Sequence, residues 1–171
     1  EENPITSGKD VEVAYELVAG GSYIISKDLD FGLNNVQLRG NKITHAKVIF
    51  EGTSSIVTCG GGLALKFIDF DCDAVVNGSF FKFGNVPSEI LGMNNYGIVT
   101  NPITFQSCTM KNVRHYLINI NGKKYAVQNF IIRDCIVELY QDTEVINFNS
   151  NNSFVKDLEI SSTTFYSHLQ S

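Results

Sequence analysis

The chain has no Trp, only three Pro and two Met, and no apolar run that approaches the length of a membrane-spanning helix, about 18 residues. We therefore expect no membrane span. Charged residues are also few, at 18%, and the formal net charge is −5. Because a nucleic-acid-binding surface needs a basic stripe, this balance excludes a nucleic-acid partner. At 171 residues the chain is long enough for one domain with a sizeable core.

Cysteine is sparse too, and its spacing excludes two common uses. Four Cys in a chain of this length do not make a disulfide scaffold, and no C-x-x-C or Cys/His spacing of a zinc site occurs. We therefore predict no metal and no cofactor. Cys108 and Cys135 share one position of the repeat described next. Buried free thiols are the favoured interpretation for them, and a disulfide between them is the alternative.

What the sequence does contain is one short pattern, repeated along the second half of the chain. Each copy has two apolar residues two apart, a small polar residue and further apolar residues, which is typical of two short strands separated by a bend. The apolar residues Phe105, Ile132 and Ile160 mark three copies, at spacings of 27 and 28 residues. A fixed period in the twenties indicates stacked repeat units. The copies occupy residues 65–72, 103–110, 130–137 and 158–165.

A second apolar strand follows three of these copies after 11 or 12 residues, at 80–83, 117–120 and 145–148. Val, Ile, Phe, Tyr and Thr dominate these runs, which favours strands over helices. We therefore predict an all-β fold, a right-handed single-stranded parallel β-helix (a solenoid) of about five coils with a 27–28-residue repeat. Residues 11–171 would form this domain of a longer protein, after a flexible N-terminal segment at 1–10.

Stacked coils would place residues 27 or 28 apart in columns, and these columns are specific predictions. Two columns would fill the interior, a third would lie outside, and three further pairs would be structural. The interior columns are Phe67/Phe105/Ile132/Ile160 and Phe83/Ile120/Phe148, the outer column is Asp73/Lys111/Glu138/Tyr166, and the pairs are Asn121 with Asn149, Arg114 with Asp142 and Arg133 with Glu159.

The acidic run Asp69, Asp71 and Asp73 allows an alternative interpretation as a calcium site, because calcium prefers several oxygen ligands. The column predicted for Asp71 continues without a second carboxylate in the other coils. A solvated strand face with paired charges is therefore the favoured interpretation, and calcium remains the alternative.

One coil is longer than the others, since Phe67 and Phe105 are 38 residues apart. The surplus lies in residues 84–99, and insertions in solenoids become loops on one face, where ligands often bind. Exposed aromatic rings can stack on sugars. The predicted carbohydrate-binding residues are Asn94, Asn95 and Tyr96 in this insertion, with His115 and Tyr116 outside it. A loop that merely packs over the coil is the alternative.

The repeat, together with the runs at 18–25 (VAGGSYII) and 36–40 (VQLRG), resembles the pectate-lyase-like superfamily of right-handed parallel β-helices. More narrowly, the chain resembles a family of uncharacterised secreted or surface β-helix proteins of gut bacteria. The likeness runs from about residue 11 to the end. It implies the fold, secretion or a place on the bacterial cell surface, and a glycan setting. Known enzymes of the superfamily cleave acidic polysaccharides with clustered Asp and an Arg, Lys or His, and no such set can be placed here.

Three functions remain open. The favoured one is a non-catalytic secreted or cell-surface module that binds glycans or mediates adhesion. The second is a polysaccharide lyase or glycosidase, which would need carboxylates converging on one groove; no catalytic residue is assigned. The third is a structural segment of a larger surface protein. A solenoid end without a cap exposes backbone groups and apolar edges, so a homo-oligomer or a further domain is expected at the C-terminal end.

Overall fold

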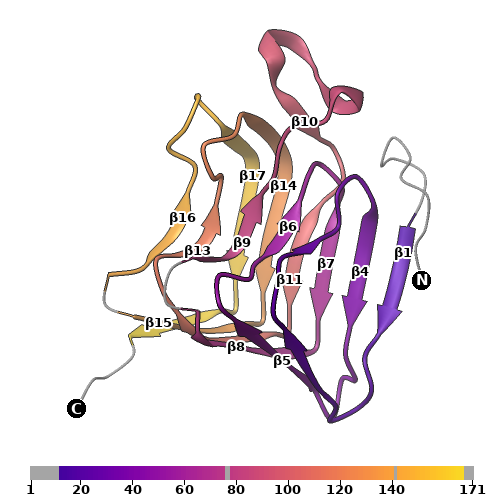
Figure 1. The fold of residues 1–171 in the computed structure, drawn as a ribbon, viewed down its shortest axis with the longest axis vertical. Coiled ribbons are helices and arrows are strands. Elements are labelled where there is room, and N and C mark those ends of the chain that lie inside the picture. Colours follow the sequence, from indigo (N-terminus) through magenta and orange to yellow (C-terminus); the bar gives the residue numbers. More distant parts are fainter. Residues whose placement is uncertain (1–11, 76–77, 141, 168–171) are drawn as a thin grey trace.

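The computed structural model describes residues 12–75, 78–140 and 142–167, and it is a parallel β-solenoid of about six turns (Figure 1). Three sheets, here called A, B and C, form its faces, and every ladder between the named strands is parallel. Among the described residues no helix is long and apolar enough to cross a membrane. The predicted parallel β-solenoid is confirmed, and its number of coils is close to the predicted five.

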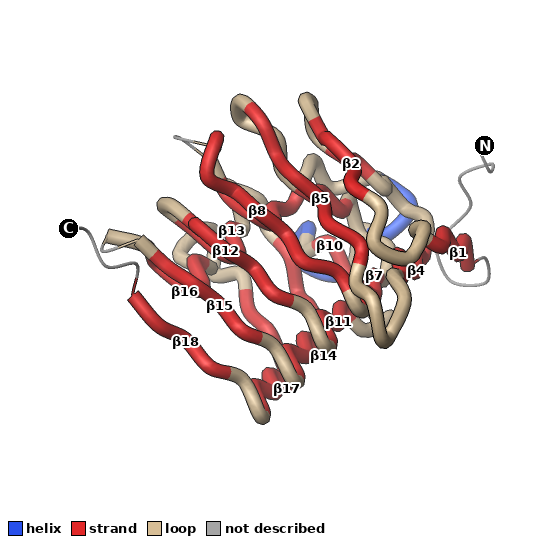
Figure 2. The backbone as a smooth tube through the Cα atoms, turned by 90° about the horizontal axis from the view of Figure 1, so that it is seen from below, coloured by secondary structure: helices blue, strands red, loops and turns tan. Residues whose placement is uncertain are grey.

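The chain visits the sheets in the order A, B, C in every full coil, with one strand in each sheet, except that the coil with the insertion has two strands in sheet A, Gly97–Val99 and Ile103–Gln106. Figure 2 shows the strands of sheet B side by side, in coil order. Sheet A contains β1 (Glu12–Glu16), β4 (Asn35–Arg39), β7 (Leu63–Lys66), β10 (Gly97–Val99), β11 (Ile103–Gln106), β14 (Tyr125–Arg133) and β17 (Phe154–Ser161). Sheet B contains β2 (Ser22–Ile25), β5 (Ala46–Glu51), β8 (Ile68–Ala74), β12 (Thr109–Val113), β15 (Ile136–Leu139) and β18 (Thr164–Ser167). Sheet C contains β3 (Leu29–Asp30), β6 (Ile56–Thr58), β9 (Ser79–Phe83), β13 (Tyr116–Asn119) and β16 (Glu144–Asn147).

The predicted columns hold from Phe105 onward, and the earliest copy is displaced by two residues. Phe105 stacks on Ile132, and Ile132 stacks on Ile160, as expected. However, the residue beside Phe105 in the preceding coil is Leu65, so the prediction for Phe67 is wrong. A shift of two residues keeps every side chain on its face of the strand, and hydrophobic alternation therefore does not detect it. The same shift makes the partner of Lys111 Asp71, where Asp73 was predicted.

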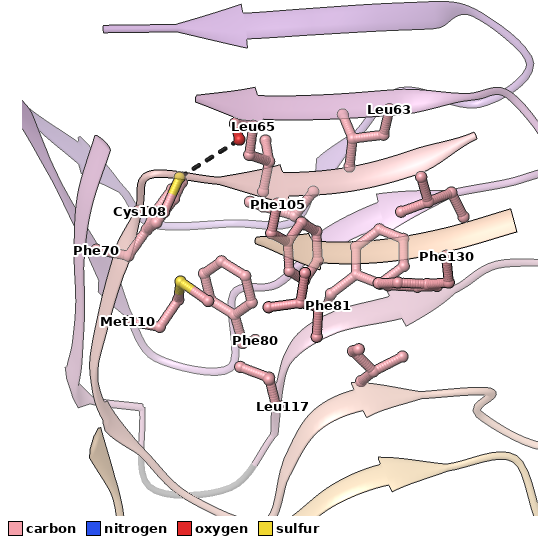
Figure 3. Close-up of a cluster of buried hydrophobic side chains, with 14 of the residues drawn as sticks. Leu63, Leu65, Phe70, Phe80, Phe81, Phe105, Cys108, Met110, Leu117 and Phe130 are labelled. Atoms are coloured by element: carbon pink, nitrogen blue, oxygen red, sulfur yellow. Dashed lines mark hydrogen bonds between the residues drawn. The ribbon is translucent and has the colours of Figure 1, made fainter. Parts of the chain in front are cut away.

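Phenylalanine rings fill the interior where sheets A and C face each other (Figure 3). The ring of Phe105 packs edge-on against Phe80, Phe81 and Phe130, with centroids 5.3 to 5.6 Å apart, an arrangement that aromatic quadrupoles favour. In the second predicted column, the rings of Phe83 and Phe148 lie 5.6 Å apart. These side chains come from different coils, so burial in the core ties each coil to the next.

A left-handed backbone residue turns the chain from sheet A into sheet B. Ser107, Asp134 and Ser162 occupy this bend in three successive coils, with φ of 52°, 53° and 47°. Short polar residues tolerate this region because their side chains can hydrogen-bond locally. Phe67 occupies the same bend one coil earlier, with φ of 59°, which is strained for a bulky residue.

Apolar side chains are more exposed in the last coil than in the coils before it. Leu158 and Ile160 of β17 are 48% and 43% exposed, whereas their neighbours Phe130 and Ile132 in β14 are 1% and 0% exposed. The expected partner at this end stays a prediction. The flexible segment predicted at 1–10 lies outside the described residues.

Glycine and alanine at position 67 should separate backbone strain from side-chain packing. Both substitutions remove the ring, but only Phe67→Gly also removes the left-handed penalty, which is about 1 kcal/mol. We expect Phe67→Gly to unfold at higher urea concentration than Phe67→Ala. The matched control is Thr104 in β11, an ordinary strand position, where glycine should be the less stable of the two. Equal midpoints for the two variants at position 67 would contradict the strain.

Candidate functional site

The five residues predicted to bind carbohydrate lie at opposite ends of sheet C. The insertion leaves the end of β9, forms two short 3-10 turns, η1 (Ser88–Ile90) and η2 (Met93–Asn95), and returns as β10. It stands above β10 at the top of Figure 1 and carries Asn94 and Asn95, whose φ angles are 59° and 63°. His115 and Tyr116 lie at the other end, where the chain passes from β12 into β13. The predicted binding residues therefore belong to two separate candidate sites.

Contacts with the following coils hold Tyr96 at the base of the insertion. The Lys124 ammonium lies 4.6 Å from the centroid of its ring, and the ring of Phe154 packs edge-on at 5.7 Å. The Tyr96 hydroxyl donates to the Asn152 carbonyl over 3.0 Å. Cation–π and aromatic contacts of this kind each contribute about 0.5–1.5 kcal/mol. Tyr96 therefore anchors the insertion to the body of the solenoid.

His115 and Tyr116 line an open groove on the outside of sheet C, here called the sheet C groove. Its volume is about 320 Å³, near the lower end of ligand sites, which run from roughly 300 to 1,000 Å³. The groove crosses three successive coils, because its walls come from the residues around β6, β9 and β13. The lining residues are Thr53, Ser55, Gly78, Ser79, Lys82, His115, Tyr116, Asn119 and Asn121.

Hydrogen bonds between coils fix the polar groups of the sheet C groove. The Asn119 amide donates to Ser79 Oγ over 3.1 Å and accepts from the Asn121 backbone N–H over 2.8 Å. The Asn121 amide in turn donates to the Phe83 carbonyl over 3.3 Å, and the Ser55 hydroxyl donates to the Ser79 carbonyl. Amides and hydroxyls both donate and accept hydrogen bonds, so the floor of the groove can pair with donor groups and with acceptor groups of a ligand.

Lys82 is held at one side of the groove by an ion pair. Its ammonium lies 3.0 Å from Asp28 Oδ2, and the other oxygen of Asp28 accepts the Ser55 backbone N–H over 3.0 Å. Sequence reasoning missed Lys82, Ser79 and Asn119 as site residues. Lys82 and Asn119 are direct neighbours across β9 and β13. Both are polar residues within the apolar second strand of each coil, and this polar position was the sequence signal that could have identified them.

Each of the three aspartates considered as a calcium site has protein partners along β8. Asp69 accepts from His45 Nδ1 over 3.0 Å, and Asp71 accepts from the Asn112 amide over 3.0 Å. Among residues 12–75, 78–140 and 142–167, no group of three His, Cys, Asp or Glu is placed to hold a metal ion. The carboxylates of β8 therefore take part in side-chain pairing between coils.

The predicted partner of Arg114 was wrong, because Arg114 pairs with Asp73. The Arg114 guanidinium lies 3.3 Å from Asp73 Oδ1 and 4.0 Å from the centroid of the Tyr140 ring, in place of the expected pairing with Asp142. The reason is a register shift between β12 and β15 after Met110, which places Val113 beside Leu139 and brings Arg114 next to Tyr140 instead of Asp142. By contrast, the pair of Arg133 with Glu159 is confirmed, and the bonds that Ser161 and Arg133 donate to Glu159 lower the pKa of its carboxyl.

Comparison with known protein families places the chain among proteins of undefined activity. A family model described as a domain of unknown function (DUF4957) matches residues 21–168, which is more than half of the chain. The chain belongs to the DUF4957 family. A search of the curated proteins and a search of the solved structures found no match. For this DUF4957 chain, the β-solenoid is therefore established by its own strand pairing.

The thiols of the DUF4957 chain are free in the structure, as favoured from the sequence. Cys108 and Cys135 are neighbours in consecutive coils, since the Ile136 N–H donates to the Cys108 carbonyl over 3.0 Å. Burial raises the pKa of the Cys108 thiol. Cys59 is the half-buried thiol, and its sulfur lies 3.7 Å from Asp30 Oδ1.

Cys59 should react slowly with alkylating reagents, because burial, and then the charge of Asp30, raise its pKa to about 11. The thiolate is the nucleophile, so a raised pKa leaves little of it near pH 8. We expect Asp30→Asn to lower this pKa and to speed iodoacetamide labelling of Cys59 severalfold, as measured by peptide mass spectrometry. The exposed substitution Glu12→Gln in β1 is the control, and equal rates in the two variants would exclude the charge effect.

Tyr96→Ala should loosen the insertion while the solenoid stays folded. Loss of the contacts with Lys124 and Phe154 should raise amide exchange in residues 84–96 by about tenfold, corresponding to ~1.4 kcal/mol of local stability. Peptide-level hydrogen exchange measures this. Met93→Ala, at a position 85% exposed, is the matched control and should leave exchange unchanged. Similar exchange in both variants would show that Tyr96 is not the anchor.

Proposed function

We propose that this DUF4957 chain is a non-catalytic glycan-binding module, secreted or at a bacterial cell surface, and that the sheet C groove is its binding site. The observation that carries the proposal is the convergence of fixed amides, hydroxyls and an aromatic residue from three coils on one open groove. Relationship to the pectate-lyase-like β-helices, and to secreted β-helix proteins of gut bacteria, is part of the same proposal. The parallel solenoid supports that relationship at the level of fold.

The chemistry of the groove suits a sugar. A pyranose offers pairs of hydroxyls that donate and accept at once, and it has a flatter C–H face. The carboxamides of Asn119 and Asn121 can match adjacent hydroxyls, because each carboxamide holds a donor and an acceptor in one plane. The ring of Tyr116 offers an apolar body with a polar tip at the edge of the groove.

The open shape of the groove also suits a polymer. Its residues follow the solenoid axis across neighbouring strands, which are about 4.8 Å apart, so a chain molecule can lie over several coils. The buried hydroxyls of Ser55 and Ser79 form part of a floor that is already hydrogen-bonded between coils. A preformed floor lowers the entropy that binding must overcome.

A glycan array with three proteins tests the proposal. Tyr116→Ala should weaken binding of the recognised glycan by about tenfold or more, ~1.4 kcal/mol, because the ring is lost from the groove. Tyr96→Ala leaves the groove intact and is the matched aromatic control. An array on which the unmodified protein binds nothing would refute glycan binding. Loss of binding in Tyr96→Ala alone would move the site to the insertion with Asn94 and Asn95.

A further inference from the structure

The charges around the sheet C groove restrict the kind of glycan that fits. Of its nine lining residues, only Lys82 and His115 can carry a positive charge, and none carries a carboxylate. The ammonium of Lys82 is neutralised by Asp28 at 3.0 Å. An acidic sugar would have to compete with Asp28 for Lys82, and exchange of one carboxylate for another gives little net energy.

The cations next to the groove also have partners. Arg114, which precedes the lining residue His115, is paired with Asp73 and lies over the ring of Tyr140. Lys123, which follows the turn after β13, donates to the Asn85 amide oxygen over 2.9 Å. These contacts hold both cations to protein groups.

A negative charge lies beside one of the lining residues of the groove. Glu144 is exposed and is the direct neighbour of Tyr116 across β13 and β16. Like charges brought together are unfavourable, and they suppress the binding of the wrong partner more than they affect the right one. The net charge of −5 acts in the same direction at long range.

Resting on the proposed function, we infer that the sheet C groove binds neutral saccharides in preference to saccharides that carry uronate or sulfate groups. The amides of Asn119 and Asn121 and the hydroxyl of Ser79 provide the recognition, because each can donate to and accept from sugar hydroxyls. The Asp28–Lys82 pair and Glu144 act against anionic sugars. The small volume of the groove fits one or two sugar units at a time.

Calorimetric titration with matched ligands tests the preference. The probes are neutral oligosaccharides of glucose, galactose and mannose, and oligogalacturonates of the same length. We expect at least one neutral series to bind roughly fivefold or more tightly than the uronates at low salt, a difference typical of one exposed charge contact. Added salt should leave binding of the neutral series unchanged.

Asp28→Asn is the decisive variant, because it releases Lys82 while an amide oxygen can still accept the Ser55 N–H. We expect it to raise uronate affinity roughly fivefold and to leave neutral affinity unchanged. Glu12→Gln, which removes one negative charge on the distant strand β1, should change neither. Circular dichroism and thermal unfolding confirm that both variants are folded.

The outcomes separate this inference from the proposed function. Tighter, salt-sensitive binding of uronates that is lost in Lys82→Gln would overturn the neutral preference and leave glycan binding in place. An Asp28→Asn variant with the uronate affinity of the unmodified protein would also overturn it. Failure of every probe to bind the unmodified protein would overturn the proposed function and the inference together.

Discussion

The backbone hydrogen bonds between consecutive coils are the constraint on which the rest of this structure depends. Apart from the short β10, each strand of the middle coils pairs in parallel with the strand one coil before it and the strand one coil after it, as β11 does with β7 and β14. This pairing sets the register, and the register decides which side chains share a column. The aromatic core, the pair of Arg133 with Glu159 and the sheet C groove all follow from it.

The later coils could be predicted from the sequence because their spacing is regular. Phe105, Ile132 and Ile160 recur at a nearly constant interval, so their column and the diagonal contact of Arg133 with Glu159 followed directly. The copy at Leu65 could not be placed, because a displacement of two residues keeps the same alternation of apolar and polar positions. The strands of the first two coils are separated by turns of three to six residues and carry no regular copy of the repeat, so the sequence predicted the number of coils only approximately.

The site was less predictable than the fold for a physical reason. The sheet C groove joins Ser55, Ser79 and Tyr116, which the coiling brings together from three different turns. Its polar groups are recognisable as a set only when the register of sheet C is known. The insertion was predicted as a binding loop because it interrupts the repeat. However, the ring of Tyr96 packs against Lys124 and Phe154, and its hydroxyl donates to the Asn152 carbonyl. Aromatic composition alone does not distinguish an anchor from a ligand platform.

The position of the groove within the stack has a consequence for its durability. A solenoid is stabilised by nearest neighbours, so thermal fraying begins at its two terminal coils and moves inward. The groove lies over the coils that contain β6, β9 and β13, with one coil before them and further strands of sheets A, B and C after them. Local opening of a coil outside this set therefore leaves the hydrogen bond between Asn119 and Ser79 in place, because both residues lie on the paired strands β9 and β13.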